Sequence, residues 1–410
     1  MKILLRAIYP YAFLLLYLIL PFDNYVRALP NILLIVLVAA FPFVITKKDI
    51  QKVKTIPVLI LLGFILFLLG NALIQGRLET DINIIKKVLI AFGLLLLYFP
   101  VRNVDKLKKI VIFSSLATIL FSVINVIIVY NTSEELLFKS YPLLIESLLI
   151  DRIYLGFLSV LSILICFDFL RPKFHPENRY YVVYIIINLL FLILIVSKVA
   201  LLILLAVLIT RQFYGKTKKV RILVTVIALT VMVFGYLQFN KEIVQQDFLK
   251  SSQNTETNFF KKTLTWDIRT IVWHCAGVIS EETGLNLFGI GFKETKDRLA
   301  DCYEEKIVDP QKKNRFVSDR YNTHNQYFDF YLSTGLIGLI LFVGFLVYLI
   351  VSNRKVFFAT ALVVVLIAYC FMENIFHRQL GAYYAGLILI LLITENSRNL
   401  NKTIKESEEA

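Results

Sequence analysis

The chain has 410 residues, of which 58% are hydrophobic and only 18% are charged, and its mean hydropathy is +0.72. Soluble proteins are roughly half apolar and about a quarter charged, so this composition excludes an ordinary soluble protein and indicates an integral membrane protein. The net charge of +14 would suit a nucleic-acid partner. Because Lys and Arg are concentrated in alternate short loops, however, we interpret the charge as a topology signal and exclude that partner.

Apolar stretches of about 20 residues, enough to cross roughly 30 Å of hydrocarbon as a helix, recur along almost the whole chain. The first stretch has no small-residue cleavage pattern, which favours a retained helix over a signal peptide. The sequence thus predicts an all-α polytopic membrane protein with about twelve transmembrane helices. These are expected at residues 7–21, 28–45, 56–74, 83–99, 109–130, 152–170, 180–196, 199–213, 221–239, 325–351, 356–373 and 379–394.

The loops rich in Lys and Arg all fall on one side of this arrangement. By the positive-inside rule that side is cytoplasmic, and both termini lie there. Lys86 and Lys87, near the outer end of the fourth span, are the main local exception. The basic set is Lys47, Lys48, Lys52 and Lys54; Arg102, Lys106, Lys108 and Lys109; Arg171, Lys173 and Arg179; Arg211, Lys216, Lys218, Lys219 and Arg221; and Arg354 and Lys355.

Four regions follow from this pattern: nine spans in 1–239, a large outer loop in 240–323, three spans in 324–395 and a charged tail in 396–410 that we expect to be disordered. A connection as long as the outer loop is uncommon unless it is functional or disordered. Helical patterning from Thr265 to Glu282 and a GIG turn at 289–291 predict a partly helical cap over the membrane domain. Its buried side would be supplied by Trp266, Trp273 and Ile279.

Only Ser197 and Lys198 interrupt an apolar run of about thirty residues from Tyr180 to Thr210. The run is too long for one helix and short for two, which predicts a tight hairpin with Lys198 at its outer tip. The alternative is a lysine that only marks the interface by extending its ammonium group into water.

The stretch HNQYFDFYLSTGLIG, from His324 to Gly338, sets a histidine and an amide at the outer lip of an apolar helix. Gly335 and Gly338 would leave room for another helix to approach. Histidine exchanges a proton near neutral pH, so His324 is a candidate base for a substrate in the membrane surface. The competing interpretation is an interfacial histidine before an ordinary helix.

Several other ionisable residues are predicted at or near membrane depth on the outer side. Charges there are costly and usually face a cavity or a bundle interior. Cations gathered beside one base would suit a phosphate-bearing lipid headgroup, because guanidinium groups bind phosphate oxygens bidentately. Local pairing of Arg152 with Asp151 and of Arg320 with Asp319 is the alternative. The set is Arg152, Lys198, Arg269, Arg320, His324, Glu373, His377 and Arg378.

Other chemistries have little support. The outward histidines lack metal-ligand spacing, so we expect neither a metal nor a cofactor. No P-loop and no GxSxG motif is present, which argues against nucleotide hydrolysis and serine hydrolysis. Cys275 and Cys302 lie on the oxidising side, where they either pair or remain free. Cys166 and Cys370 lie within spans and are interpreted as core residues.

Three segments resemble the O-antigen ligase and O-antigen polymerase superfamily of bacterial envelope glycosyltransferases. HNQYFDFYLSTGLIGLILF is similar to the family's His-Asn-x-Tyr/Phe motif running into a Gly-x-x-Gly helix. RTIVWHCAGVISEETGLNLFGIGFK resembles the preceding Arg-x-x-x-Trp helix and Gly-x-Gly turn. VSKVALLILL stands in place of the Ser-Arg-rich hairpin, with Lys198 where the family usually has arginine. The likeness covers roughly residues 150–395.

The resemblance implies transfer of a glycan from an undecaprenyl-diphosphate carrier to a sugar hydroxyl at the outer face of the bacterial inner membrane, with no cofactor. His324 and Glu373 would be the catalytic candidates, His324 as the base. Arg269, Lys198, Arg152 and Arg320 are the candidates for binding the diphosphate. A lipid A-core or another glycan would be the acceptor. One base without a carboxylate pair suits a single, inverting displacement.

Two functions of this superfamily remain open at the level of sequence. A ligase attaches a finished polymer to its acceptor, whereas a polymerase adds repeat units to a growing chain. A flippase or transporter for lipid-linked glycans is the alternative from another class. A transporter should place polar residues along a midplane pathway, but here they cluster at one face.

Overall fold

The computed structural model describes residues 2–133, 148–171, 175–214, 226 and 267–408, and the regular elements within them are all helical. The predicted span at 221–239 and Trp266 lie outside these residues. In chain order the elements are α1 (Lys2–Ile19), η1 (Leu20–Phe22), α2 (Leu29–Val44), α3 (Lys47–Val53), α4 (Ile56–Ile74), α5 (Leu78–Tyr98), α6 (Val104–Ser133), α8 (Arg152–Phe169), α9 (Asn178–Leu194), α10 (Lys198–Gln212), α14 (Asp267–Thr283), α15 (Phe292–Lys306), α16 (Pro310–Asp319), α17 (Gln326–Asn353), α18 (Phe357–Met372), η2 (Ile375–His377) and α19 (Gln379–Glu408).

The chain is a helical polytopic membrane protein, but the predicted count of twelve spans is not supported. Among the described residues, five helices are long and apolar enough to cross a membrane: α1 with η1, α4, the Val104–Val129 part of α6, α8 and α17. Four more are apolar but shorter: α2, α9, α18 and the Gln379–Thr394 part of α19. A 16-residue helix such as α18 is only about 24 Å long, less than the roughly 30 Å of hydrocarbon.

The core of the bundle lies around α19. Its apolar residues from Ala382 to Leu392 are almost all buried, and it packs along α5 and against α18. Helix α8 is also largely buried, and Phe157 on it stacks on Tyr369 of α18 with ring centroids 3.9 Å apart. By contrast, α2, α4 and α9 expose large apolar side chains outward, such as Ile35 and Leu190. These faces suit contact with lipid, where apolar exposure carries no penalty.

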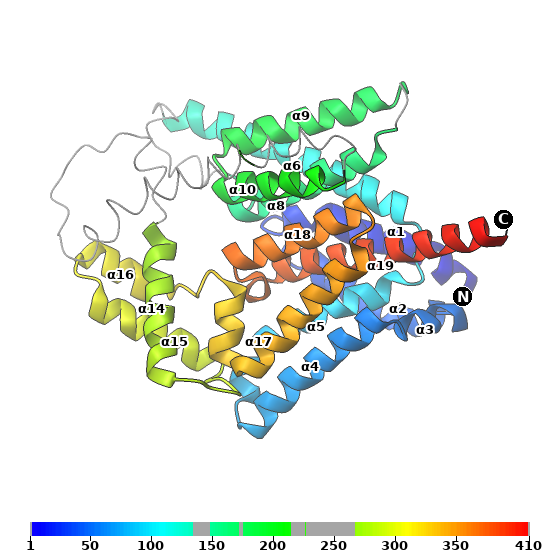
Figure 1. Cartoon of the computed structure of the whole chain (residues 1–410). Coiled ribbons are helices and arrows are strands. Elements are labelled where there is room, and N and C mark those ends of the chain that lie inside the picture. Colours follow the sequence, from blue (N-terminus) through cyan, green and yellow to red (C-terminus); the bar gives the residue numbers. More distant parts are fainter. Residues whose placement is uncertain (1, 134–147, 172–174, 215–225, 227–266, 409–410) are drawn as a thin grey trace.

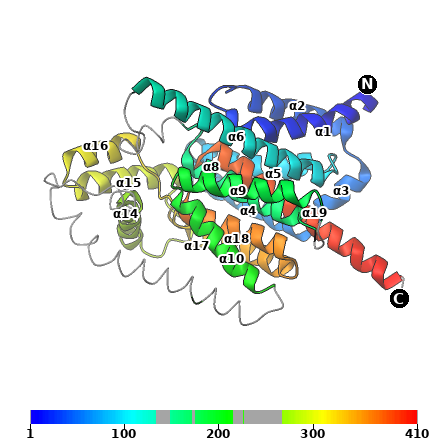
Figure 2. The ribbon, with the colours of Figure 1, turned by 90° about the horizontal axis from the view of Figure 1, so that it is seen from above.

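The two ends of the bundle differ. Figure 1 shows α14, α15 and α16 at one end and both chain ends at the other, and Figure 2 agrees. Contacts between loops predicted to be cytoplasmic lie away from the helices of the outer loop. They join Arg102 to Asp49 at 2.9 Å, Lys108 to Asp168 at 2.8 Å, and the Tyr214 hydroxyl to the Arg354 carbonyl at 2.7 Å.

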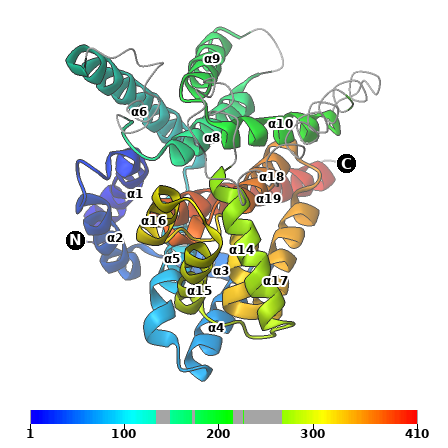
Figure 3. The same cartoon turned by 90° about the vertical axis from the view of Figure 1, so that its left-hand side faces the viewer.

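The hairpin predicted around Lys198 is present as a tight turn. Helix α9 ends at Leu194 and α10 begins at Lys198, with Val196 between them in the left-handed region at φ 47°. The two helices then diverge, because both pack against α8 and α10 also packs against α18. Figure 3 shows α9 and α10 running at an angle to each other.

The cap, defined here as α14 to α16, folds around its own small core. Residues of α14 and α15, including Ile271, Ile279 and Tyr303, are buried together with Leu332 of α17. A disulfide joins Cys275 of α14 to Cys302 of α15, which decides the pairing that the sequence left open. The predicted helix at 265–282 is thus confirmed from Asp267 onward, and the cap packs against the membrane helices (Figure 3).

Helix α17 is broken at Gly335, where no second helix approaches, whereas at Gly338 the expected approach is present, since an added Cβ would lie 3.2 Å from Phe67 of α4. Gly335 has φ 77° and ψ −175°, and the loop before α15 enters the break instead. Ile290 and Gly291 donate backbone hydrogen bonds to Leu332 and Ser333, at 2.8 and 2.9 Å. Leu336 donates in return to Asn286 at 2.9 Å. The loop thus satisfies the backbone groups that the break releases, which membrane-depth backbone requires.

Glycine at this junction is a steric necessity. A Cβ built on Gly335 would lie 2.3 Å from the Leu287 backbone, and one on Gly289 would lie 2.4 Å from the Ser333 backbone. Arg77, just before α5, fixes the other side of the loop, because its guanidinium donates to the Gly289 carbonyl at 2.8 Å. The GIG turn predicted from sequence is therefore the point where the cap meets both α17 and α5.

Two further features concern the bundle itself. The tail expected to be disordered instead continues α19 as far as Glu408, since Lys and Glu favour helix once a preceding helix supplies the nucleus.

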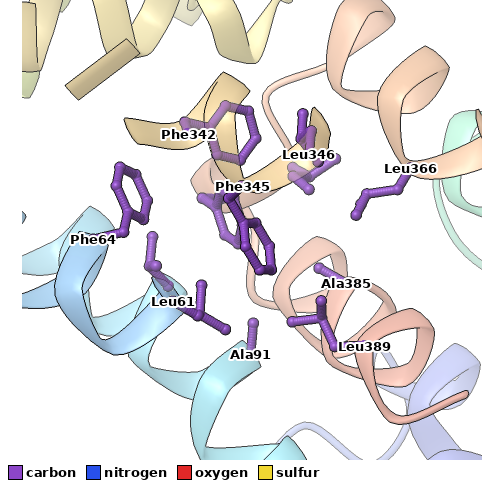
Figure 4. A pocket seen from close by; sticks show the side chains of 12 residues that line it. Leu61, Phe64, Ala91, Phe342, Phe345, Leu346, Leu366, Ala385 and Leu389 are labelled. Carbon is purple, nitrogen blue, oxygen red and sulfur yellow. The ribbon is translucent and has the colours of Figure 1, made fainter. Parts of the chain in front are cut away.

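A cavity of about 20 Å³ lies between α4, α5, α17 and α19 (Figure 4), with an entirely apolar lining that includes Leu61, Phe345 and Leu389. That volume admits little more than one water molecule, and an apolar cavity stays dry.

Candidate functional site

His324 stands in the short link between α16 and α17. Its backbone is in the left-handed region at φ 42°, and its N–H donates to the Asn322 side chain at 3.0 Å. The next residue, Asn325, caps α17 by accepting from the N–H groups of Tyr327 and Phe328. A non-glycine residue in this region is uncommon, and histidine is one of the residues that adopt it more readily. The link thus holds the imidazole in a defined direction.

That direction is toward Glu373, which follows the last turn of α18. The Nδ1 atom of His324 lies 3.0 and 3.2 Å from the two Glu373 carboxylate oxygens. A carboxylate only accepts hydrogen bonds, so Nδ1 carries the proton and Nε2 has the free lone pair. Among the described residues, Nε2 has no hydrogen-bond partner although it is buried. It is the atom of this pair that is available to remove a proton.

Glu373 also binds Arg269 of the cap. The guanidinium lies 3.8 Å from the carboxylate, and its Nε donates to the Met372 carbonyl at 3.1 Å. Burial alone would raise the pKa of the Glu373 carboxyl, but His324, Arg269 and Arg378 outweigh it and hold that pKa below its ordinary value. Glu373 is therefore ionised, and it stands between the base and a cation.

Two more cations, Arg152 and Lys198, come from helices of the membrane domain. Arg152 is the first residue of α8, and its guanidinium points toward the Val196 carbonyl at 3.5 Å, in the turn before Lys198. Burial lowers the pKa of Lys198 to about 8, and the charges of Arg152 and Arg269 add to that effect. Three cations from α8, α10 and α14 thus lie close enough to repel one another, and Arg269 connects them to Glu373. This concentration of positive charge suits an anionic group with several oxygens.

Arg320 is engaged elsewhere. Its guanidinium forms an ion pair with Asp297 of α15, so its partner is not the neighbouring Asp319 that the sequence suggested as an alternative. Asp319 pairs with Arg315 instead, at 3.8 Å. Arg152 likewise does not take Asp151, which caps α8 and binds Arg378 at 3.2 Å. Five of the six predicted site residues therefore come together, and Arg320 is held within the cap.

Arg378 also joins the site; it belongs to the outer ionisable set expected from the sequence but not to the six candidate site residues. Besides binding Asp151, it lowers the pKa of Glu373 and lies 5.8 Å from the centre of the Tyr154 ring. The available signal was its position five residues after Glu373, in a short polar segment between two apolar helices.

Trp273 fixes the cap above this group. Its indole N–H donates to the Thr323 carbonyl at 3.1 Å, and its ring meets Phe371 of α18 edge to face at 5.5 Å. Thr323 precedes His324, and Phe371 lies two residues before Glu373. One side chain therefore connects the helix that carries Arg269 to both segments that carry the histidine–carboxylate pair.

Comparison with known proteins gives one positive finding. No curated protein matches the chain. Residues 182–343 match the sequence model of the family described as O-Antigen ligase. The matched segment includes Lys198, Arg269 and His324, whereas Arg152 and Glu373 lie outside it. This match supports the resemblance to the O-antigen ligase superfamily that the sequence motifs indicate.

Proposed function

We propose that the protein is a glycosyltransferase that moves a glycan from undecaprenyl diphosphate to a sugar hydroxyl at the outer face of the bacterial inner membrane. The family is associated with glycosyltransferase-like ligase and polymerase activity. The observation that supports the proposal most directly is the position of Glu373 between His324 and Arg269, at 3.0 and 3.8 Å. The base and the cations are then adjacent. This is the arrangement needed when the acceptor hydroxyl attacks the anomeric carbon and the diphosphate leaves from the same carbon.

In the proposed reaction, Nε2 of His324 removes the proton of the acceptor hydroxyl. The hydroxyl oxygen attacks the anomeric carbon of the donor glycan, and the bond from that carbon to the diphosphate oxygen breaks. Glu373 holds the imidazole through Nδ1 and stabilises the imidazolium that forms. A single displacement of this kind inverts the anomeric configuration.

The leaving diphosphate carries the charge that must be stabilised. Arg152, Lys198 and Arg269 are assigned to it, because cations placed where charge develops lower the barrier directly. Arg320 would contribute only by giving up Asp297. The donor is already activated, so the scheme needs no nucleotide and no cofactor.

We favour a ligase that uses a lipid A-core or similar acceptor, and the polymerase of the same superfamily is the second candidate. Both would share the donor chemistry above. A flippase is disfavoured, because a cation and a base meet at Glu373, next to a cap that lies at one end of the bundle (Figure 1).

The test is an in vitro transfer assay with purified lipid-linked donor, wild-type protein and a chelator. The proposal expects transfer to continue with the chelator and to stop in His324→Ala. The carbohydrate lost on gene deletion separates the two candidates. Unsubstituted core with polymer left on the carrier indicates a ligase, and core carrying a single repeat unit indicates a polymerase.

A further inference from the structure

A second histidine–carboxylate pair lies next to the first and has no part in the chemistry described above. The Nε2 atom of His377 donates to the Asp329 carboxylate at 2.9 Å. Asp329 is 2% exposed and also accepts from the Gln326 amide at 3.0 Å. Burying a carboxylate costs free energy unless it is paired and hydrogen-bonded. The contact with His377 therefore stabilises the buried Asp329 carboxylate.

The two histidine–carboxylate pairs connect the same two segments, and the segment that supplies the histidine in one pair supplies the carboxylate in the other. One segment is the start of α17, with His324 just before it and Asp329 in its first turn. The other is the α18–α19 linker, residues 373–378, which carries Glu373 at its start and His377 near its end. Each segment thus supplies one histidine and one carboxylate to the other.

The linker has little regular structure of its own and is held by side chains. The Asn374 amide donates to the Thr323 hydroxyl at 2.9 Å, and its oxygen accepts from the Asn325 N–H. The Phe376 N–H donates to the Gln326 side chain at 3.1 Å. These contacts fix the middle of the linker to the residues on both sides of His324.

The far end of the linker is fixed by charged groups. Lys87 of α5 donates to the His377 carbonyl at 2.6 Å, while the His377 ring binds Asp329. Glu373 itself follows α18 in an extended conformation, at φ −154° and ψ 151°. The Glu373 N–H still donates to the Tyr369 carbonyl at 2.9 Å, but the chain leaves the helix at this residue. The position of the Glu373 carboxylate therefore depends both on the end of α18 and on where the linker is held.

We infer that His377 and Asp329 are positioning residues for the His324–Glu373 pair. Their contact sets the register of the linker against the start of α17, and this register keeps the Glu373 carboxylate within hydrogen-bonding distance of Nδ1 of His324. Partners of this outer kind commonly determine the orientation of the group that performs the chemistry. The inference rests on the proposed function, because it assigns a purpose to the orientation of His324.

The experiment is a double-mutant cycle on the purified full-length protein, with kcat and donor KM from the transfer assay. His377→Ala should lower kcat by roughly 10- to 100-fold, the usual range for loss of such a partner, with donor KM changed by less than about 3-fold. Glu373→Ala should lower kcat at least as much. In the Glu373→Ala background, His377→Ala should then lower kcat by less than about 3-fold, because the group it positions is gone.

Two variants keep the test decisive if His377→Ala folds poorly. His377→Gln places an amide donor near the position of Nε2 and should recover most of the lost kcat. Asp329→Ala removes the acceptor and should reproduce the loss of kcat in a protein that elutes as a single species in detergent. The matched control is His175→Ala, at a half-buried histidine in the link between α8 and α9, and its kcat should be unchanged.

The inference is overturned if the effects of His377→Ala and Glu373→Ala multiply, if His377→Gln is as poor as the alanine variant, or if folding is the only property that changes. An active His324→Ala protein would instead remove the base on which the proposed function depends. If His324→Ala is inactive but the cycle is additive, the proposed function survives and only the positioning role fails.

Discussion

Glu373 accepts a hydrogen bond from His324 at 3.0 Å although the two residues are 49 positions apart in the chain. The same carboxylate lies 3.8 Å from Arg269 on the cap. One ionised group therefore joins a histidine at the start of α17, the end of α18 and the helix above them. Substitution of His324, Glu373 or Arg269 should therefore change the kinetics of transfer in different ways.

His324→Ala should lower kcat by about 10²- to 10⁴-fold, the usual contribution of a positioned base. Expression, membrane insertion and donor binding should stay close to wild type, since Nε2 has no hydrogen-bond partner among the described residues. The measurement is single-turnover transfer with purified lipid-linked donor. Near-normal turnover by well-folded protein would leave acceptor activation to Glu373 or to no protein base.

Arg269→Ala should weaken donor binding by about 10- to 100-fold, since a hydrogen bond to a charged group contributes roughly 1.5–3 kcal/mol. Arg269→Lys should recover only part of this, because it keeps the charge but loses the planar fork. Donor titration by calorimetry in detergent measures the effect. Arg298→Ala is the matched control, as this arginine pairs with Glu294 on the exposed side of α15; equal losses in both variants would indicate nonspecific charge attraction.

Much of this site follows from local patterns. The amide of Asn325 after a polar link predicts the start of α17, and the Arg-x-x-x-Trp spacing on α14 sets Arg269 and Trp273 nearly one turn apart. The helix cap and the helical spacing each depend only on residues a few positions apart, so both can be predicted from the sequence. The family resemblance then brings Arg269 and His324 together.

Other features depend on contacts between distant segments. Gly335 looks like a small residue of a helix face, and only the loop at Asn286–Gly291 entering α17 makes it a break. Arg320 has an acid beside it in the chain but takes Asp297 from another helix. The count of twelve spans is not supported among the described residues, because hydropathy measures apolar content whereas crossing also needs length, and α9 and α18 are shorter than the spanning helices.

Donor affinity should fall as the pH rises through about 8 in the free protein. Burial and the charges of Arg152 and Arg269 bring the pKa of Lys198 to about 8, so the ammonium is charged below that pH and loses its proton above it. A neutral amine no longer attracts a diphosphate. Donor affinity measured from pH 6.5 to 9.5 should show this step, and Lys198→Arg should abolish it because arginine stays protonated; a step that persists in Lys198→Arg would assign it to another group.

Removal of the disulfide should destabilise the cap more than the membrane helices. Cys275 and Cys302 are separated by 27 positions, and a crosslink of that span contributes about 3 kcal/mol in the chain-entropy account. Cys275→Ser should therefore increase hydrogen exchange in α14 and α15 while α19 stays protected. Reduction of wild type with dithiothreitol should give the same pattern, and Cys166→Ser, in the core of α8, is the control for loss of a thiol.

The junction between the cap and α17 should tolerate no side chain at Gly335. Its φ of 77° with ψ near 180° is a conformation that only glycine adopts readily, and a Cβ would lie 2.3 Å from the Leu287 carbonyl oxygen. Gly335→Ala should thus destabilise the protein by at least ~1–3 kcal/mol from the backbone conformation alone, with more from the steric overlap. Gly344→Ala, further along the same helix, has nothing within 4 Å of the added carbon and should be neutral or slightly stabilising. Thermal unfolding in detergent compares the two, and a Gly335→Ala protein as stable as wild type would mean that the loop does not occupy the break.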